Sequence, residues 1–283
     1  MKSRLILMCF ISLFFLNACT NNENKDNSWN LKIQNVGNYS KEDGDKKIKI
    51  AILDSGINKR HFAKNLITKS YNVITNENKT NDEFDHGTKI ASIIIDEKIG
   101  INTNVEIFDI QVINNKGQTT INNVCDGISK AIEYEADVIN MSLGFNTNNK
   151  QLKECIDKAH KKNIILVASS GDTMSDISDY PAEYKNVISV AAIDKNKELF
   201  GFSSTGKIDF FAPGVDVIAK DNKGNYIKTE GSSIASANFT GVLSIYLNKN
   251  IDKKEIYLQD NVEFFNFNGR VINILVFNKN TNK

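Results

Sequence analysis

Short apolar runs rich in β-branched residues alternate with helical patterns from Lys46 onward, and this alternation constrains the fold more than any other feature of the sequence. Strands joined by crossover helices pair in parallel, and near-continuous apolar strands are buried on both faces. The sequence therefore predicts an α/β fold with a mostly parallel central sheet and helices on both faces. The expected strands are Ile48–Asp54, Val105–Ile113, Asp137–Gly144, Asn163–Gly171 and Asn186–Ile193, and the expected helices are His86–Lys98, Thr119–Glu135 and Asn149–Lys162.

The composition indicates one globular domain with a sizeable core, because the chain has 283 residues of which 41% are hydrophobic. Its formal net charge of +1 shows no bias toward nucleic acid or an anionic membrane surface. We expect a monomer that has no nucleic-acid partner.

The N-terminus carries the pattern of an export signal over residues 1–18. Lys2 and Arg4 precede the apolar run Leu5–Leu16, which is short for a membrane span but suits the core of a signal. The following "LNAC" resembles a bacterial lipobox in which Cys19 takes up diacylglycerol, although Asn17 is unusual there. Polar residues 19–28 would form a tether, with the globular domain over 29–283 on the extracellular face of the cell membrane. The alternatives are a simple secretory signal, a poorly cleaved membrane anchor, or a signal that is not processed and leaves the protein in the cytoplasm.

Two of the four cysteines, Cys9 and Cys19, belong to this signal. The other two, Cys125 and Cys155, each lie inside an expected helix. We predict that both are buried thiols.

Polar residues at strand ends and helix starts are the candidate functional groups, because chemistry gathers outside the carboxyl ends of parallel strands. Asp54 ends the first strand, and His86 stands at the start of an expected helix, whereas His61 and His160 lie in polar surroundings. The stretch "TEGSSIASANFTG" places serines at the start of a buried helix, where free N–H groups can stabilise an oxyanion. Each residue alone has a structural reading as a turn or helix cap, but together they indicate nucleophilic catalysis.

Three motifs, "AILDSGI", "DHGTKIAS" and "GSSIASANFTG", resemble in order the catalytic motifs of the subtilisin family of serine peptidases. The resemblance extends to "INMSLG", "YPAEYKNVISVAAID", "FSSTG", "FFAPG" and "NGRVIN". It implies a three-layer subtilisin-like fold and a serine endopeptidase without a cofactor. It also implies that Ser233 is the nucleophile, that His86 is the general base and that Asp54 orients His86, with no chemical role for Ser236.

One departure from the family pattern is Asp172, which stands where the family has an Asn that donates a hydrogen bond to the oxyanion. An ionised Asp172 would repel the oxyanion, and a protonated one could donate to it. The backbone N–H of Ser233 is the remaining donor that the resemblance implies.

By similarity, Asp179 falls at the floor of the S1 pocket, where a buried carboxylate would favour a cationic or strongly hydrogen-bonding P1 side chain. The alternative is that loop differences turn Asp179 into solvent. The resemblance implies a cis Tyr180–Pro181 bond and, since the segment 93–104 lacks the family's calcium loop, no metal site. The remaining substrate-binding residues that it implies are Ser142, Leu143 and Gly144, which would pair with substrate backbone, and Ser169, Ser170 and Gly171.

Within the family, the small size, the lipobox, Asp172 and the short stretch between Cys19 and the domain are most similar to lantibiotic leader peptidases. These enzymes remove the leader from one modified precursor peptide, which would then be the partner of this chain. The alternatives are a general surface protease and a catalytically silent lipoprotein that binds peptides.

Overall fold

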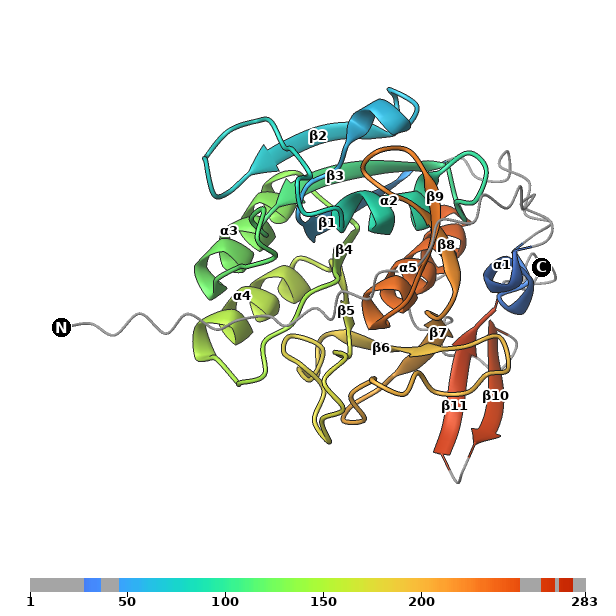
Figure 1. Cartoon of the computed structure of the whole chain (residues 1–283). Coiled ribbons are helices and arrows are strands. Elements are labelled where there is room, and N and C mark those ends of the chain that lie inside the picture. Colours follow the sequence, from blue (N-terminus) through green and yellow to red (C-terminus); the bar gives the residue numbers. More distant parts are fainter. Residues whose placement is uncertain (1–27, 37–45, 250–260, 268–269, 277–283) are drawn as a thin grey trace.

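A mostly parallel sheet forms the middle of the computed structural model, which describes residues 28–36, 46–249, 261–267 and 270–276 (Figure 1). Within these residues the sheet has nine strands in the order β10-β11-β7-β6-β5-β4-β1-β3-β2. Neighbouring strands are parallel except for the β10–β11 pair. The predicted α/β fold is confirmed.

The five predicted strands are all present at the centre of the sheet. They are β1 Ile48–Asp54, β3 Val105–Gln111, β4 Val138–Met141, β5 Ile165–Ser169 and β6 Ile188–Ile193. The strands that the sequence analysis did not name lie toward the edges or outside the sheet. They are β2 Ile67–Asn72, β7 Phe210–Pro213, β10 Val262–Phe267, β11 Arg270–Leu275 and the separate antiparallel pair β8 Val217–Lys220 and β9 Tyr226–Thr229.

Helices cover both faces of the sheet. Both faces present apolar side chains, because successive residues of each central strand point to opposite faces. Along β1, Ile50 and Ile52 belong to one apolar cluster and Ala51 and Leu53 to the other. The first cluster is shared with α2 Gly87–Ile95 and α5 Ser232–Asn248, and the second with α3 Ile121–Glu133 and α4 Lys150–Lys161. The short α1 Trp29–Ile33 and the 3₁₀ turn η2 Lys59–His61 complete the helices of the described residues.

Local side chains fix where the helices begin and end. The Thr120 hydroxyl accepts the N–H of Asn123 at the start of α3, and the Asn149 side chain does the same for Leu152 at the start of α4. Helix α2 ends at Ile95, before the predicted Lys98, because the Asp96 carboxylate accepts the N–H groups of the next turn.

The prediction of two buried thiols is wrong, because Cys125 and Cys155 form a disulfide with their Cα atoms 5.6 Å apart. Helices α3 and α4 pack side by side on the same face of the sheet and bring the two positions together (Figure 1). The pairing depends on this helix packing, which the spacing of the cysteines does not reveal.

Three other expectations concern the backbone and the N-terminus. The Tyr180–Pro181 bond is cis, as the resemblance implies. The export signal, Cys19 and the tether up to residue 27 lie outside the described residues. In the parts of the chain that the structure describes, no helix is long and apolar enough to cross a membrane.

A buried carboxylate in β3 makes the stability depend on pH. Asp109 is 1% exposed, its Oδ2 accepts hydrogen bonds from Ser70 and Thr80, and its Oδ1 is buried without a partner. Burial raises the pKa of Asp109 to about 7. The folded chain therefore keeps a proton that the unfolded chain loses above about pH 4, and stability falls as the pH rises toward 7.

We predict that Asp109→Asn raises the free energy of unfolding at pH 8 by on the order of 1–4 kcal/mol and changes it little near pH 4. Urea unfolding at the two pH values measures this, with Ser233, the nucleophile that the resemblance implies, replaced by Ala throughout. The exposed Asp126→Asn is the matched control. An equal effect of Asp109→Asn at both pH values would contradict the prediction.

Candidate active site

Asp54 and His86 meet where β1 ends and α2 begins. The Nδ1 atom of His86 lies 2.8 Å and 3.0 Å from the two carboxylate oxygens of Asp54. Asp54 is 1% exposed and also accepts the N–H of Ser55 at 2.7 Å. A carboxylate at Nδ1 holds the proton on that nitrogen, which leaves Nε2 as the basic atom facing the cleft.

Helix α2 comes this close to β1 because residue 87 is glycine. A Cβ atom at Gly87 would lie 2.2 Å from the carbonyl oxygen of Gly56 and 3.2 Å from the Cβ of Asp54. The Gly87 N–H donates to the Ser55 hydroxyl at 2.9 Å, and that hydroxyl donates to Asp82 at 2.7 Å. Any larger residue at position 87 would push His86 away from Asp54.

Asp82 is a residue of the site that the sequence analysis missed. It is 4% exposed, and its carboxylate also accepts the N–H groups of Asp85 at 2.8 Å and Thr88 at 2.9 Å. Asp82 thus holds both sides of the turn that carries His86. Its position four residues before His86 was visible in the sequence, but its burial was not.

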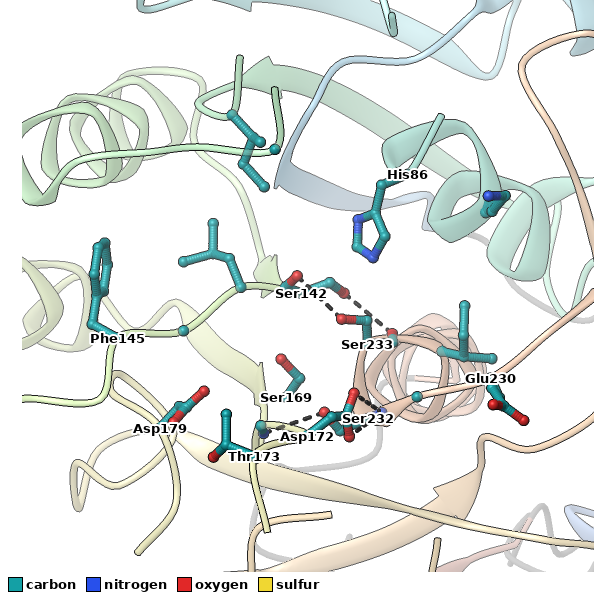
Figure 2. A pocket seen from close by; sticks show the side chains of 18 of the residues that line it. His86, Ser142, Phe145, Ser169, Asp172, Thr173, Asp179, Glu230, Ser232 and Ser233 are labelled. Atoms are coloured by element: carbon teal, nitrogen blue, oxygen red, sulfur yellow. Dashed lines mark hydrogen bonds between the residues drawn. The ribbon is translucent and has the colours of Figure 1, made fainter. Parts of the chain in front are cut away.

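Ser233 is the second residue of α5, and its side chain faces His86 across the cleft (Figure 2). Its hydroxyl donates to the carbonyl of Ser142 at 3.2 Å, and no hydrogen bond joins this hydroxyl to His86 in the described structure. A hydrogen bond between a hydroxyl and an imidazole of this kind is often long when no substrate is bound. Rotation about the Cα–Cβ bond of Ser233 moves its hydroxyl. Ser236 instead donates to the Ser233 carbonyl at 2.9 Å and is fully buried, so its role is structural.

Asp172 follows β5 and lies against the first turn of α5 (Figure 2). Both of its carboxylate oxygens are 3.0 Å from the backbone nitrogen of Ser232. Burial raises the pKa of Asp172, while hydrogen bonds from Ser232 and the charge of His86 oppose the rise. The next N–H, that of Ser233, is in the helical turn whose N–H groups have no partner within the helix. The Asp172 carboxylate and the Ser233 N–H therefore both lie at the N-terminus of α5.

A cleft of about 270 Å³ contains His86, Ser233 and Asp172. Six of the seven residues expected to bind substrate line it: Ser142, Leu143, Gly144, Ser169, Gly171 and Asp179. Ser170 does not, because it is fully buried, and its carbonyl accepts the Asp179 N–H at 2.8 Å instead. Residues that the sequence analysis did not single out also line the cleft, among them Lys89, Glu230, Ile113, Phe145 and Phe200.

Asp179 lines the cleft (Figure 2) and is half-buried against the backbone of two glycines. A Cβ at Gly171 would be 2.5 Å from its Oδ2, and one at Gly144 would be 2.5 Å from its Cβ. Burial, with a smaller contribution from the charge of Asp172, raises the pKa of Asp179 to about 6. The alternative in which a loop turns Asp179 outward does not describe this structure.

The environment of His86 sets its basicity. Burial lowers the pKa of His86, but the charge and hydrogen bond of Asp54 outweigh it, and the pKa lies above its usual value of 6.5. Among the described residues, no group of three or more His, Cys, Asp or Glu side chains could hold a metal ion. The geometry suits proton transfer between a hydroxyl and an imidazole.

Comparison with known proteins gives matches over most of the chain. The model of the subtilase family of peptidases matches residues 45–260. Subtilisin DY of Bacillus licheniformis is 34% identical over 212 residues, which are 71% of this chain and 77% of that protein. The thermophilic serine proteinase of Bacillus sp. (strain AK1) is 30% identical over 73% of this chain, and subtilisin E of Bacillus subtilis (strain 168) is 30% identical over 76%.

The coverage of these relatives differs. The chain spans 54% of the thermophilic proteinase and 59% of subtilisin E. A crystal structure of a cold adapted subtilisin-like serine proteinase superimposes with a TM-score of 0.71, over 78% of this chain and 85% of the other. At 24% identity this last match bears on the fold alone.

We predict that Asp54→Asn moves the pKa of His86 from above 6.5 to below it, since burial remains and the opposing charge is lost. An NMR pH titration of the imidazole resonances measures the change. His61 and His160 serve as internal references, and the exposed Asp126→Asn is the control variant. The prediction is wrong if His86 titrates alike in both variants and the unaltered protein.

Proposed function

Because the chain belongs to the subtilase family and is a subtilisin-like serine endopeptidase, we propose that Asp54, His86 and Ser233 are its catalytic residues. Nε2 of His86 takes the Ser233 proton as Oγ forms a bond to the scissile carbonyl carbon. The imidazolium then gives this proton to the leaving amine as the C–N bond breaks. Water, deprotonated by His86, hydrolyses the acyl-enzyme and restores the Ser233 hydroxyl.

We propose that the oxyanion is stabilised by the backbone N–H of Ser233 and by a protonated Asp172. The contacts between Asp172 and Ser232 place a carboxyl beside that N–H, and burial of Asp172 raises its pKa in the direction that a donor needs. An ionised Asp172 would instead place negative charge next to the oxyanion.

Two variants of Asp172 and a series of pH values test its role. The activity should fall as the pH rises through the raised pKa of Asp172, while Asp172→Asn, which donates at every pH, should keep or raise kcat and flatten the alkaline limb. Asp172→Ala should lose about 10²–10³-fold in kcat. The exposed Asp176→Asn on the same loop is the matched control, and Ser233→Ala should be inactive. Equal pH profiles for Asp172→Ala and the unaltered enzyme would remove Asp172 from the chemistry.

We propose that the natural substrate is a precursor peptide, as in lantibiotic maturation, whose leader ends in a basic or strongly hydrogen-bonding residue. The observation that carries this proposal is Asp179 in its glycine-walled part of the cleft. Because Gly144 and Gly171 have no side chains, their backbone lies close to the Asp179 side chain. This half-buried carboxylate is poorly solvated until a hydrogen-bond donor pairs with it. Such a pocket suits cleavage at one site better than general digestion.

A precursor peptide with Arg before the cleavage site should be cut much faster than the same peptide with Phe there, and faster than casein. Asp179→Ser should lower kcat/KM for the Arg peptide by about 10²-fold and remove the preference. Since the pKa of Asp179 is about 6, KM for the Arg peptide should rise as the pH falls below 6. Equal cleavage of casein and of both peptides would favour a general surface protease.

We propose that the protein is exported and held on the outer face of the cell membrane by lipid on Cys19. The Cys125–Cys155 disulfide supports export, because such bonds persist in oxidising compartments. It disfavours the alternative of an unprocessed cytoplasmic protein.

Cys19→Ala should release the protein from the membrane fraction of its host or leave the precursor uncut, whereas Cys9→Ala, a change within the expected signal, should not. Fractionation and intact-mass measurement of the mature N-terminus monitor both outcomes. Unmodified full-length protein in the cytosol would contradict the proposal.

A further inference from the structure

The turn between β8 and β9 is held in one shape by its own side chains. The Asp221 carboxylate accepts the N–H groups of Lys223 at 2.9 Å and Asn225 at 2.7 Å. Gly224 has a φ of +91° and donates its N–H to the Asp221 carbonyl at 3.0 Å, which closes a β-turn with Asn222 at its second position. The turn is therefore a rigid tip at the end of the hairpin.

Asn222 at this tip contacts the segment that leads into His86. Its backbone N–H donates to Oδ1 of Asp85 at 2.6 Å, and its side-chain amide donates to the Asp82 carbonyl at 2.9 Å. Its own carbonyl accepts from Asn58 at 2.6 Å and lies 3.0 Å from Nε2 of His61. These contacts fix the tip to the loop before α2.

Asp85 directly precedes His86 and has a φ of +67°, in the left-handed region that a residue with a side chain rarely adopts. Such a conformation persists where the surroundings hold it. Here the Asn222 N–H holds one carboxylate oxygen, and Lys89 pairs with the other at 2.8 Å. The direction in which the chain enters His86 thus depends on the tip.

The rest of the hairpin joins the two halves of the active site. Along α2, the Lys220 N–H donates to the Ser92 hydroxyl at 2.8 Å, and the Lys220 ammonium pairs with the buried Asp96. Strand β9 leads within four residues into the start of α5 and Ser233 (Figure 1). One hairpin therefore contacts the helix that begins after His86 and continues into the helix that carries Ser233.

We propose that the hairpin tip, through the contact of Asn222 with Asp85, sets the position of the His86 imidazole relative to Ser233. Asn222 and Asp85 are positioning residues, and they touch neither the substrate nor the reacting atoms. The proposal rests on the catalytic roles proposed above for His86 and Ser233. A displaced imidazole would slow proton transfer without weakening substrate binding.

The test variant is Asn222→Pro, because proline suits the second position of this turn and removes the N–H that Asp85 accepts. Asp85→Ala removes the acceptor, and Asp85→Asn restores one. Active sites are titrated with a fluorophosphonate, so that kcat refers to competent enzyme. We expect kcat to fall about 10- to 100-fold in Asn222→Pro and Asp85→Ala, with KM within about twofold. Asp85→Asn should recover most of the loss.

The matched control is Lys223→Ala, an exposed neighbour in the same turn, which should leave kcat unchanged. The low-field NMR resonance of the His86 Nδ1 proton should shift in Asn222→Pro and not in the control. If Asn222→Pro does not fold, Asp85→Ala, which removes the acceptor of the same hydrogen bond, carries the test with the same expectation.

The proposal is overturned if kcat per titrated site is unchanged while only the melting temperature falls, since that is the result of a purely structural role. It is likewise overturned if Asp85→Asn is as slow as Asp85→Ala. Full activity of Ser233→Ala would instead overturn the catalytic assignment itself.

Discussion

The close approach of helix α2 to the end of strand β1 is the contact on which the rest of the site depends. A carboxylate buried as deeply as Asp54, which is 1% exposed, is costly unless its oxygens are hydrogen-bonded. The Ser55 N–H and the His86 imidazole meet that need, and Gly87 provides the space for it. The N–H groups of Asp85 and Thr88 donate to Asp82 and so hold the turn that carries His86. The geometry of the His86 imidazole is thus tied to the stability of the core.

Electrostatics in the cleft are dominated by carboxylates. Burial raises the pKa of Asp172, Asp179 and Glu230, and the charge of Asp172 adds to the rise for the other two. A cation bound at Asp179 would relieve this mutual repulsion, and its charge would be balanced locally. The proposed basic side chain in S1 pairs with Asp179, whereas the proposed proton is held by Asp172, so the two proposals concern different carboxylates of the same cleft.

Features set by strand order were the most predictable from the sequence. The five central strands and the placement of Asp54 could be predicted because buried parallel strands are apolar and end in polar residues at the site. Ser170 was expected to bind substrate with Ser169 and Gly171, but it does not line the cleft as they do, because its side chain is buried. Asp82 was missed because its burial is not visible in the sequence, and the disulfide was missed because it depends on packing between two helices. A helical pattern shows on which face of its helix a residue lies, but not which residue of another helix it contacts.

The bond between Cys125 and Cys155 has a mechanical consequence for the cleft. Gly117 and Thr119, before α3, and Phe145 and Asn146, before α4, all line it. The covalent link closes a loop with a sequence separation of 30 residues, for which chain entropy gives about 3–4 kcal/mol of stabilisation. The disulfide also links helix α3 covalently to helix α4. A movement that widens the cleft by displacing one of these helices must therefore displace the other as well.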